Sequence, residues 1–380
     1  MQQTLTQRIE AVNQQAIAEG RIVGSVVLVA QRGALIYAGA SGYADREQRR
    51  PMQRNSQFRL SSVSKPYITL AAMRMIEQQL LSLDDVVSRW LPWFTPELPD
   101  GRRPAIAIRH LLTHTAGLDY RFNQPEGGIY QRLGIQDGME QTSLTLEQNL
   151  RRLAQAPLQA EPGSVFGYSL AIDVLGAVLE QVAGMPLPQL FERWVGQPLG
   201  LGNTGFYTQD ADNLATAYYD SEPQPAVMYD GLRQTLPEGF GFAVEFAPSR
   251  ALDRHAYPSA GAGMVGDADD VLRLVETLRS GCDGILQPET AALMRQPHVG
   301  AQAETQGPGW GFGFGGALLV DAELAATPQN NGTLQWGGVY GHTWFYDPVA
   351  QMSVIILTNT AFEGLSGLYP VQIRDAVYGQ

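Results

Sequence analysis

Apolar and polar positions follow two different periods along the chain, and the change of period divides it into parts. Near the N-terminus the pattern predicts a polar amphipathic helix over 4–19 and two strands over 23–30 and 34–38, joined by the turn Gln31-Arg32-Gly33. From about 62 to 200 the apolar spacing is close to 3.6 residues, which is typical of helices. These predicted helices cover 64–80, 105–116, 144–156 and 169–184.

Strand patterns return in the C-terminal third, after a segment, 203–262, that has the composition of a loop. Asp267 stands where a side chain would cap a helix over 268–279. The strands predicted after it are 311–320, 333–339, 343–346 and 352–358, and the last helix is 366–378. The aromatic residues between 203 and 246 fit two interpretations, a lid over a pocket or the packing of a long loop.

Strands at both ends with helices between them predict an α+β fold in which one sheet is built from the two ends of the chain. We expect a single unit of 380 residues with two lobes. Residues 1–61 and 260–380 would form the α/β lobe, and residues 62–259 a mostly helical lobe that ends in a long loop region, 203–259. A cleft between lobes is where a ligand site usually lies.

Composition and charge exclude several classes of protein. The formal charge is −12, from 38 acidic and 26 basic residues, so most of the surface would repel a phosphate backbone and we expect no nucleic-acid partner. No apolar run approaches the roughly 18 residues that span a bilayer, and the N-terminus lacks the apolar core of a secretory signal. We therefore expect a cytoplasmic protein without a membrane span. The single cysteine, Cys282, cannot form an internal disulfide, and its polar setting favours a spare thiol over a nucleophile.

The 26 basic residues are 25 arginines and one lysine, Lys65. Arginine can replace lysine as a surface cation, but it cannot lose its proton near neutral pH. Two interpretations stay equally open from this count alone. Lys65 is either a catalytic base or a leftover surface residue.

Ser62 precedes Lys65 by three residues, which places both side chains on one face of a helix. A lysine buried near the positive end of a helix is pushed toward its neutral form, and a neutral amine can take the proton of a serine hydroxyl and make it a nucleophile. Tyr168, at the start of another predicted helix, could relay that proton, or it could simply cap the helix.

The stretch Trp336-Gly337-Gly338-Val339 offers a third component. Glycines in a strand let a ligand approach the backbone, and an N–H group there could form an oxyanion hole with the N–H of Ser62. The alternative interpretation is a bulged strand at the edge of the sheet.

In order along the chain, these motifs resemble the serine hydrolases of the class C β-lactamase and penicillin-binding-protein superfamily, and within it the family VIII carboxylesterases. The resemblance runs essentially end to end and is carried by 58–66, 83–87, 108–118, 167–176, 261–264 and 334–344. It implies a β-lactamase/transpeptidase-like fold, an antiparallel sheet flanked by terminal helices plus an inserted helical lobe.

The resemblance also implies roles for individual residues. Ser62 would be the nucleophile, with Lys65 and Tyr168 as its base pair. The N–H groups of Ser62 and Val339 would form the oxyanion hole. Tyr120 and Trp336 would line the acyl and alcohol pockets, and Gly337 and Gly338 would contact the substrate. No metal and no organic cofactor are implied.

Two departures from the lactamase pattern bear on the substrate. The usual Tyr-x-Asn is Tyr168-Ser169-Leu170 here, and the usual Lys-Thr-Gly is Trp336-Gly337-Gly338. A lysine on that strand would pair with the carboxylate of a β-lactam, a contact worth roughly 1.5–3 kcal/mol. Tryptophan offers apolar area and one donor instead.

We therefore predict a serine carboxylesterase that acts on a small-molecule ester with a short acyl chain, with weak or no β-lactam hydrolysis. The alternatives are an acyltransferase, a β-lactamase or D-Ala peptidase, and a catalytically silent binding protein. Nothing in the sequence predicts the oligomeric state.

The histidines give weaker signals. His110 and His114 have the spacing of a zinc pair, but the glutamate of His-Glu-x-x-His is absent, so we expect structural roles. His342 as a general base for an unrelated serine is a minor alternative. The chain contains no Gly-x-Ser-x-Gly elbow, which argues against an α/β-hydrolase.

Overall fold

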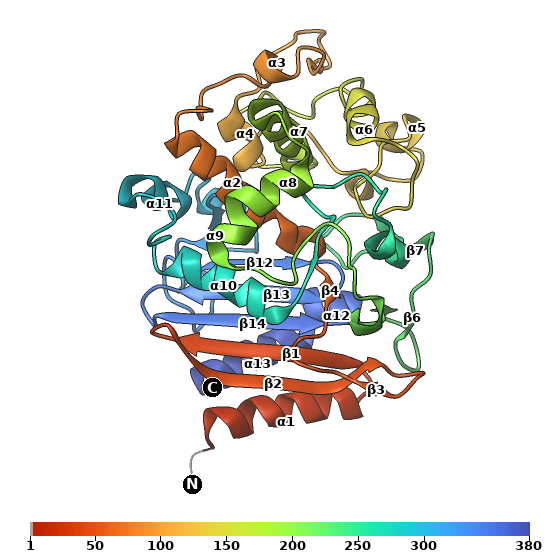
Figure 1. The fold of residues 1–380 in the computed structure, drawn as a ribbon, viewed down its shortest axis with the longest axis vertical. Helices are drawn as coiled ribbons and strands as arrows, with labels where there is room; N and C mark the ends of the chain where they lie inside the picture. The colour runs from red at the N-terminus through yellow and green to blue at the C-terminus, as the bar shows by residue number, and fades with distance from the viewer. Residues whose placement is uncertain (1–2) are drawn as a thin grey trace.

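Strands from the two ends of the chain lie side by side in one eight-stranded antiparallel sheet in the computed structural model, which describes residues 3–380 (Figure 1). The strand order is β10-β11-β12-β13-β14-β1-β2-β3. The strands are β1 (Gly24–Gln31), β2 (Ala34–Asp45), β3 (Arg50–Pro51), β10 (Trp310–Phe312), β11 (Ala317–Leu319), β12 (Leu334–Gly338), β13 (His342–Asp347) and β14 (Met352–Thr358). The predicted α+β arrangement, with one sheet built from both ends of the chain, is confirmed.

The first and last long strands of this sheet pair directly. Val27 of β1 lies opposite Ile356 of β14, so strands from the two ends of the chain are neighbours in the middle of the sheet. Val26 and Leu28 face one hydrophobic core and Val27 and Val29 face another. Because both faces are covered, β1 is a continuous apolar run rather than an alternating one.

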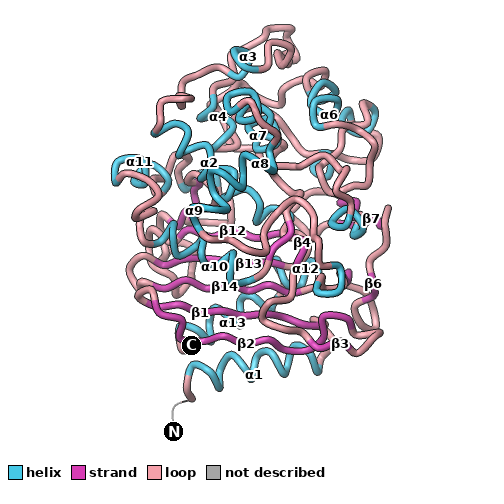
Figure 2. Tube along the Cα trace, viewed as in Figure 1, coloured by secondary structure: helices cyan, strands magenta, loops and turns pink. Residues whose placement is uncertain are grey.

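Helices cover the two faces of the sheet (Figures 1 and 2). On one face α10 (Ala268–Arg279) packs against β1, β13 and β14. On the other face α1 (Leu5–Ala18) and α13 (Leu368–Tyr378) pack against each other. The buried hydroxyl of Tyr369 lies 2.6 Å from Asn13 Oδ1 and 2.7 Å from Ser25 Oγ, which links α13 to α1 and to the sheet.

The region between the two halves of the sheet is mostly helical. Its helices are α2 (Ser64–Glu77), α3 (Val87–Trp90), α4 (Ile108–Leu112), α5 (Ile129–Arg132), α6 (Leu146–Leu153), α7 (Ala171–Ala183), α8 (Leu187–Phe191) and α9 (Gln197–Leu199). Two short helices, α11 (Pro288–Met294) and α12 (Ala361–Ser366), accompany the C-terminal strands. Most residues of α2 and α7 are buried, so these helices form the centre of the region rather than an amphipathic surface. We propose that the boundaries between the two lobes lie after residues 61 and 259.

Several elements differ from their predictions, among them β2, which was predicted over 34–38 and runs to Asp45. The helix predicted over 105–116 is only α4, because His114 adopts the left-handed region (φ 52°) shortly after its end. The strand predicted over 311–320 is the hairpin β10–β11, which turns at Gly315 (φ 96°). Strand β12 is internal, between β11 and β13, so the interpretation as an edge strand is wrong.

The predicted loop region contains short hairpins that the pattern did not indicate. They are β5 (Tyr218–Tyr219) with β6 (Ala226–Val227), and β7 (Leu232–Thr235) with β8 (Ala243–Phe246). A further pair, β4 (Phe58–Arg59) with β9 (Val265–Gly266), joins the segment before α2 to the segment before α10. The predicted cap of α10 is confirmed, since the Asp267 carboxylate accepts the N–H of Asp270 at 2.9 Å.

Within residues 3–380 no single helix is long and apolar enough to cross a membrane. One bent pair of segments, Ala171–Ala183 with Leu187–Leu199, reaches that length only jointly, across an 80° bend.

Candidate active site

A tight turn places Ser62 at the entrance to α2. Residues Ser61–Val63 form a single 3₁₀ turn, and Ser61 has φ 44°, a left-handed conformation that is unusual for a residue with a side chain. The turn is fixed from the other side by the β4–β9 pair, through the hydrogen bond from the N–H of Leu60 to the carbonyl of Met264 at 2.8 Å. The backbone around Ser62 is therefore held by tertiary contacts rather than by the helix alone.

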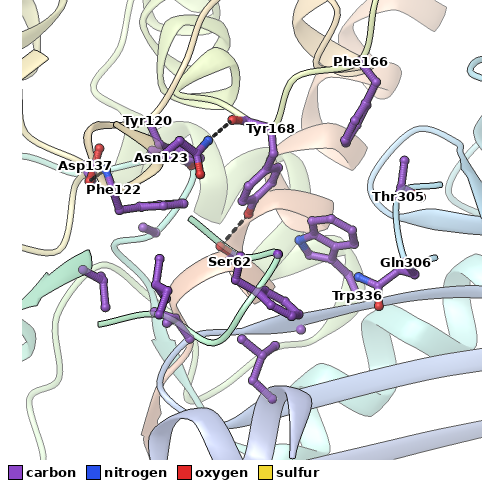
Figure 3. A pocket seen from close by; sticks show the side chains of 18 of the residues that line it. Ser62, Tyr120, Phe122, Asn123, Asp137, Phe166, Tyr168, Thr305, Gln306 and Trp336 are labelled. Carbon is purple, nitrogen blue, oxygen red and sulfur yellow. Dashed lines mark hydrogen bonds between the residues drawn. The ribbon is translucent and has the colours of Figure 1, made fainter. Parts of the chain in front are cut away.

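Two side chains, those of Lys65 and Tyr168, contact the Ser62 hydroxyl. Lys65 Nζ lies 3.0 Å from Ser62 Oγ, and the Tyr168 hydroxyl donates to the same oxygen at 2.7 Å (Figure 3). Lys65 is only 2% exposed, so its amine faces the serine and not bulk solvent. The arrangement brings together the three residues that the sequence singled out and provides two groups that can exchange a proton with the serine oxygen.

A buried carboxylate supports Lys65 through a backbone segment. Lys65 Nζ donates to the carbonyl of Gly261 at 2.8 Å, and the N–H of Gly261 donates to Asp173 at 3.1 Å. Asp173 also accepts the hydroxyl of Ser259 at 2.9 Å, and its burial raises its pKa. Asp173 was not among the residues predicted from the sequence, although an acidic residue in the first turn of the apolar helix α7 is a signal that could have found it.

Tyr168 lies three residues before α7 and does not cap it. Its backbone carbonyl accepts the side-chain amide of Asn123 at 3.0 Å, and its ring lies 4.8 Å from the ring of His114. His114 in turn accepts the N–H of Ser169 at its Nδ1, 3.2 Å away. These contacts orient the tyrosine so that its hydroxyl points at Ser62 (Figure 3).

The histidines have structural roles in this geometry, as predicted. Burial, and secondarily the nearby Lys65, lowers the pKa of His114 well below its ordinary value, so the ring is neutral at pH 7. The Nδ1 of His110 accepts the N–H of Ala107 at 3.1 Å, at the start of α4. Within the described residues no group of three or more His, Cys, Asp or Glu side chains could hold a metal ion.

The end of β12 lies directly against the Ser62 turn. A Cβ atom on Gly338 would be 2.4 Å from the carbonyl oxygen of Leu60 and 2.5 Å from Ser61 Oγ, so only glycine allows this approach. In the part of the chain that the structure describes, the N–H groups of Ser62 and Val339 donate to no protein acceptor. Ser62 and Val339 line the same cavity, so both N–H groups are available to a bound ligand, as the predicted oxyanion hole requires.

A cavity of about 640 Å³ opens in front of Ser62. Tyr120, Phe122, Tyr168, Trp336, Gly337 and Val339 are among the residues that line it. The rings of Tyr120 and Phe122 stack at 4.5 Å, and the ring of Trp336 lies 5.2 Å from that of Tyr168 (Figure 3). Gly338, predicted to contact the substrate, is not part of this lining, because it packs against Leu60 and Ser61 instead.

Asp137 is a second buried carboxyl that the sequence analysis missed. It lines the cavity and accepts the N–H groups of Arg121 and Phe122 at 2.7 and 3.0 Å. Burial, together with the nearby Glu140 carboxylate, raises the pKa of Asp137. Its hydrogen bonds fix the segment that presents Tyr120 and Phe122 to the cavity.

The two remaining candidates lie apart from this chemistry. His342 Nε2 donates to the carbonyl of Arg59 at 2.8 Å, and burial lowers the pKa of its imidazole to about 4. Cys282 is 1% exposed rather than in an open polar loop, and burial raises the pKa of its thiol to about 11. A protonated, covered thiol is a poor nucleophile.

Comparisons with known proteins give relatives along nearly the whole chain. The family model described as Beta-lactamase matches residues 5–376. Esterase EstB from Burkholderia gladioli is 50% identical over 377 residues, covering 99% of this chain and 96% of that protein. A solved structure described as "EstCE1, a hydrolase with promiscuous acyltransferase activity" is 76% identical, with a TM-score of 0.97 over 98% of both chains. The unliganded simvastatin synthase from Aspergillus terreus, at 22% identity and a TM-score of 0.76 over 100% of this chain and 99% of that one, shares the fold.

Proposed function

Because the chain belongs to the beta-lactamase family, we propose that it is a serine carboxylesterase that hydrolyses short-chain acyl esters through an acyl-enzyme. The observation that carries this proposal is the Ser62 hydroxyl held between Lys65 Nζ at 3.0 Å and the Tyr168 hydroxyl at 2.7 Å. The similarity to a protein named Esterase EstB over 99% of the chain supports an ester as the substrate.

The geometry supports a two-step reaction. Ser62 Oγ attacks the ester carbonyl while its proton passes to the Lys65–Tyr168 pair, and the N–H groups of Ser62 and Val339 donate hydrogen bonds to the developing oxyanion. Tyr168 then protonates the alcohol oxygen as the carbon–oxygen bond breaks, which leaves the acyl group on Ser62. Water activated by the same pair attacks the acyl-enzyme and releases the acid.

The charges around the cavity support a neutral acyl ester over an anionic lactam. Among the residues that line the cavity in the described part of the chain there is no arginine and no lysine, whereas Asp137 and Glu304 are present. A substrate carboxylate would lose its water there without gaining a cationic partner. Trp336 presents an apolar ring where a lactamase has a lysine, and this favours an uncharged ester.

Acyl transfer is a second candidate activity. The rings of Tyr120, Phe122 and Trp336 give the cavity beside Ser62 apolar walls, and the relative EstCE1 is described as having promiscuous acyltransferase activity. An alcohol can then intercept the same acyl-enzyme. The ratio of alcoholysis to hydrolysis, measured with vinyl butyrate in water containing a primary alcohol, separates the two activities.

The test uses a fluorophosphonate probe, an ester and a lactam. We expect the probe to label the wild-type chain on Ser62 and not the Ser62→Ala variant. We expect kcat/KM for p-nitrophenyl butyrate to exceed that for nitrocefin. Absence of labelling would make the chain a silent binding protein, and a higher kcat/KM on nitrocefin would make it a β-lactamase.

The setting of this reaction is also part of the proposal. We place the enzyme in the cytoplasm, acting on a small-molecule ester without a metal, an organic cofactor or a nucleic-acid partner. The charge of −12 supports the absence of a nucleic-acid partner.

A further inference from the structure

A second groove adjoins the active-site cavity and shares part of its wall. Its volume is about 320 Å³, and Phe240, Gln306, Trp336, Gly337 and Leu365 line both spaces. The groove continues over β12 and β13. Phe345 and Ile356, which line it, belong to the hydrophobic core that packs against α13. A molecule bound at Ser62 can therefore extend past Trp336 into this groove.

A row of hydrogen-bonded side chains, one threonine and three glutamines, lies along the groove. Thr327 Oγ1 donates to Gln329 Oε1 at 2.9 Å, and Gln329 Nε2 donates to Gln335 Oε1 at 3.0 Å. Gln335 Nε2 lies 3.4 Å from Gln306 Oε1. Because Gln306 also lines the active-site cavity, the row of side chains reaches that cavity. Gln329 is only 3% exposed, Gln335 is half-buried and Gln306 is exposed, so the row runs from the interior of the protein to its surface.

The chemistry of the groove fits hydroxyl groups better than a charged group or a hydrocarbon chain. An amide both donates and accepts, as a hydroxyl does, and the Nε2 of Gln306 makes no hydrogen bond within residues 3–380. The one charged residue in the lining, Arg374, is already paired with Asp375 at 2.7 Å. A hydrocarbon chain would cover the Nε2 of Gln306 without giving it an acceptor, which is costly.

Aromatic rings border the same space. Phe240, Trp310 and Trp336 line the groove beside the amides. Flat apolar faces combined with a few placed amides are suited to a compact ring that carries hydroxyl groups.

The position of Trp336 assigns the groove to one part of the substrate. The alcohol oxygen of the ester must lie near the Tyr168 hydroxyl that protonates it, and the Trp336 ring is 5.2 Å from the Tyr168 ring. We propose that the groove binds the alcohol portion of the ester and that this portion is an uncharged polyhydroxylated alcohol such as a monosaccharide. This inference rests on the proposed esterase function and names its substrate class.

The test compares 6-O-butyryl glucose with ethyl butyrate. We expect the wild-type enzyme to show a higher kcat/KM for the sugar ester. In the double variant Gln306→Met and Gln335→Met we expect the ratio of the two kcat/KM values to fall by about tenfold, since two hydrogen bonds to uncharged groups are lost. The matched control is Gln302→Met, on the same segment as Gln306 but outside the groove, which leaves the ratio unchanged.

A binding measurement separates this inference from the proposed function. In the Ser62→Ala chain, calorimetric titration should show tighter binding of 6-O-butyryl glucose than of ethyl butyrate, and the two methionine substitutions should remove the preference. If the wild-type enzyme hydrolyses ethyl butyrate but neither experiment shows a preference for the sugar ester, the groove assignment is wrong and the esterase stands. If the preference in binding is present while fluorophosphonate labelling fails, the groove holds and the esterase proposal is wrong.

Discussion

At the scale of single residues, the position of one amine decides the chemistry. Lys65 is the only lysine in the chain, it is 2% exposed, and it contacts both Ser62 and the carbonyl of Gly261. A surface cation would not need this position, because the surface of the protein uses arginine throughout. The structure therefore removes the interpretation of Lys65 as a leftover surface residue.

The substitution Lys65→Arg tests the role of this amine. Arginine keeps the charge and nearly the length but cannot release a proton, so we expect kcat/KM for p-nitrophenyl butyrate to fall by at least about 100-fold. Circular dichroism shows whether the variant is folded. Activity within a fewfold of the wild type in a folded variant would remove Lys65 from proton transfer.

At the scale of elements, the site depends on how closely a strand approaches a turn. The end of β12 and the turn before α2 come from residues that are more than 270 positions apart, and they meet at Gly338 and Leu60. The contact sets the distance between the N–H groups of Ser62 and Val339. An oxyanion hole made of two backbone donors works only while that distance is kept.

Gly338→Ala tests this contact. The added methyl would lie 2.4 Å from a backbone oxygen, so the strand or the turn must shift, and we expect kcat/KM to fall by about tenfold to 100-fold. Gly202→Ala is the control, because a Cβ at Gly202 meets nothing within 4 Å. Equal activity of the two variants would show that the approach of β12 does not set the oxyanion donors.

At the scale of the whole molecule, the link between the sheet and the segment before Ser62 makes stability depend on pH. His342 on β13 donates to the carbonyl of Arg59 on β4 and is buried, and its pKa of about 4 lies below the ordinary value of 6.5. Between these two values the unfolded chain binds a proton at His342 that the folded protein does not bind. Falling pH in that window therefore favours unfolding.

The substitution His342→Gln isolates this effect, since glutamine can donate from the position of Nε2 but does not titrate. Between pH 7 and pH 4.5 we expect the free energy of unfolding of the wild type to fall by about 2 kcal/mol more than that of the variant. Urea unfolding at the two pH values measures the difference, and other titrating groups cancel in it. Parallel loss of stability in both proteins would mean that His342 takes up its proton in the folded state as readily as in the unfolded chain.

The sequence by itself determined the class of fold and made Ser62, Lys65 and Tyr168 candidates, whose catalytic roles came from the resemblance to a known family. A unique lysine three residues after a serine, a tyrosine before an apolar helix and strands at both ends are local patterns, and the structure brings Ser62, Lys65 and Tyr168 within hydrogen-bond distance. Helix and strand periods are likewise local, which is why most of the long elements were predicted within a few residues of their observed limits.

The side chains that support Ser62, Lys65 and Tyr168 and that line the cavity were decided only by the tertiary structure. Asp173 acts on Lys65 through Gly261, and Asp137 holds the segment of Tyr120, across separations that no local pattern encodes. The same holds for the amides at Gln306, Gln329 and Gln335, which form one row because the packing of a strand and two loops places them together. Residue types and their spacing are properties of the chain, whereas burial and contacts between distant segments exist only once the sheet has closed.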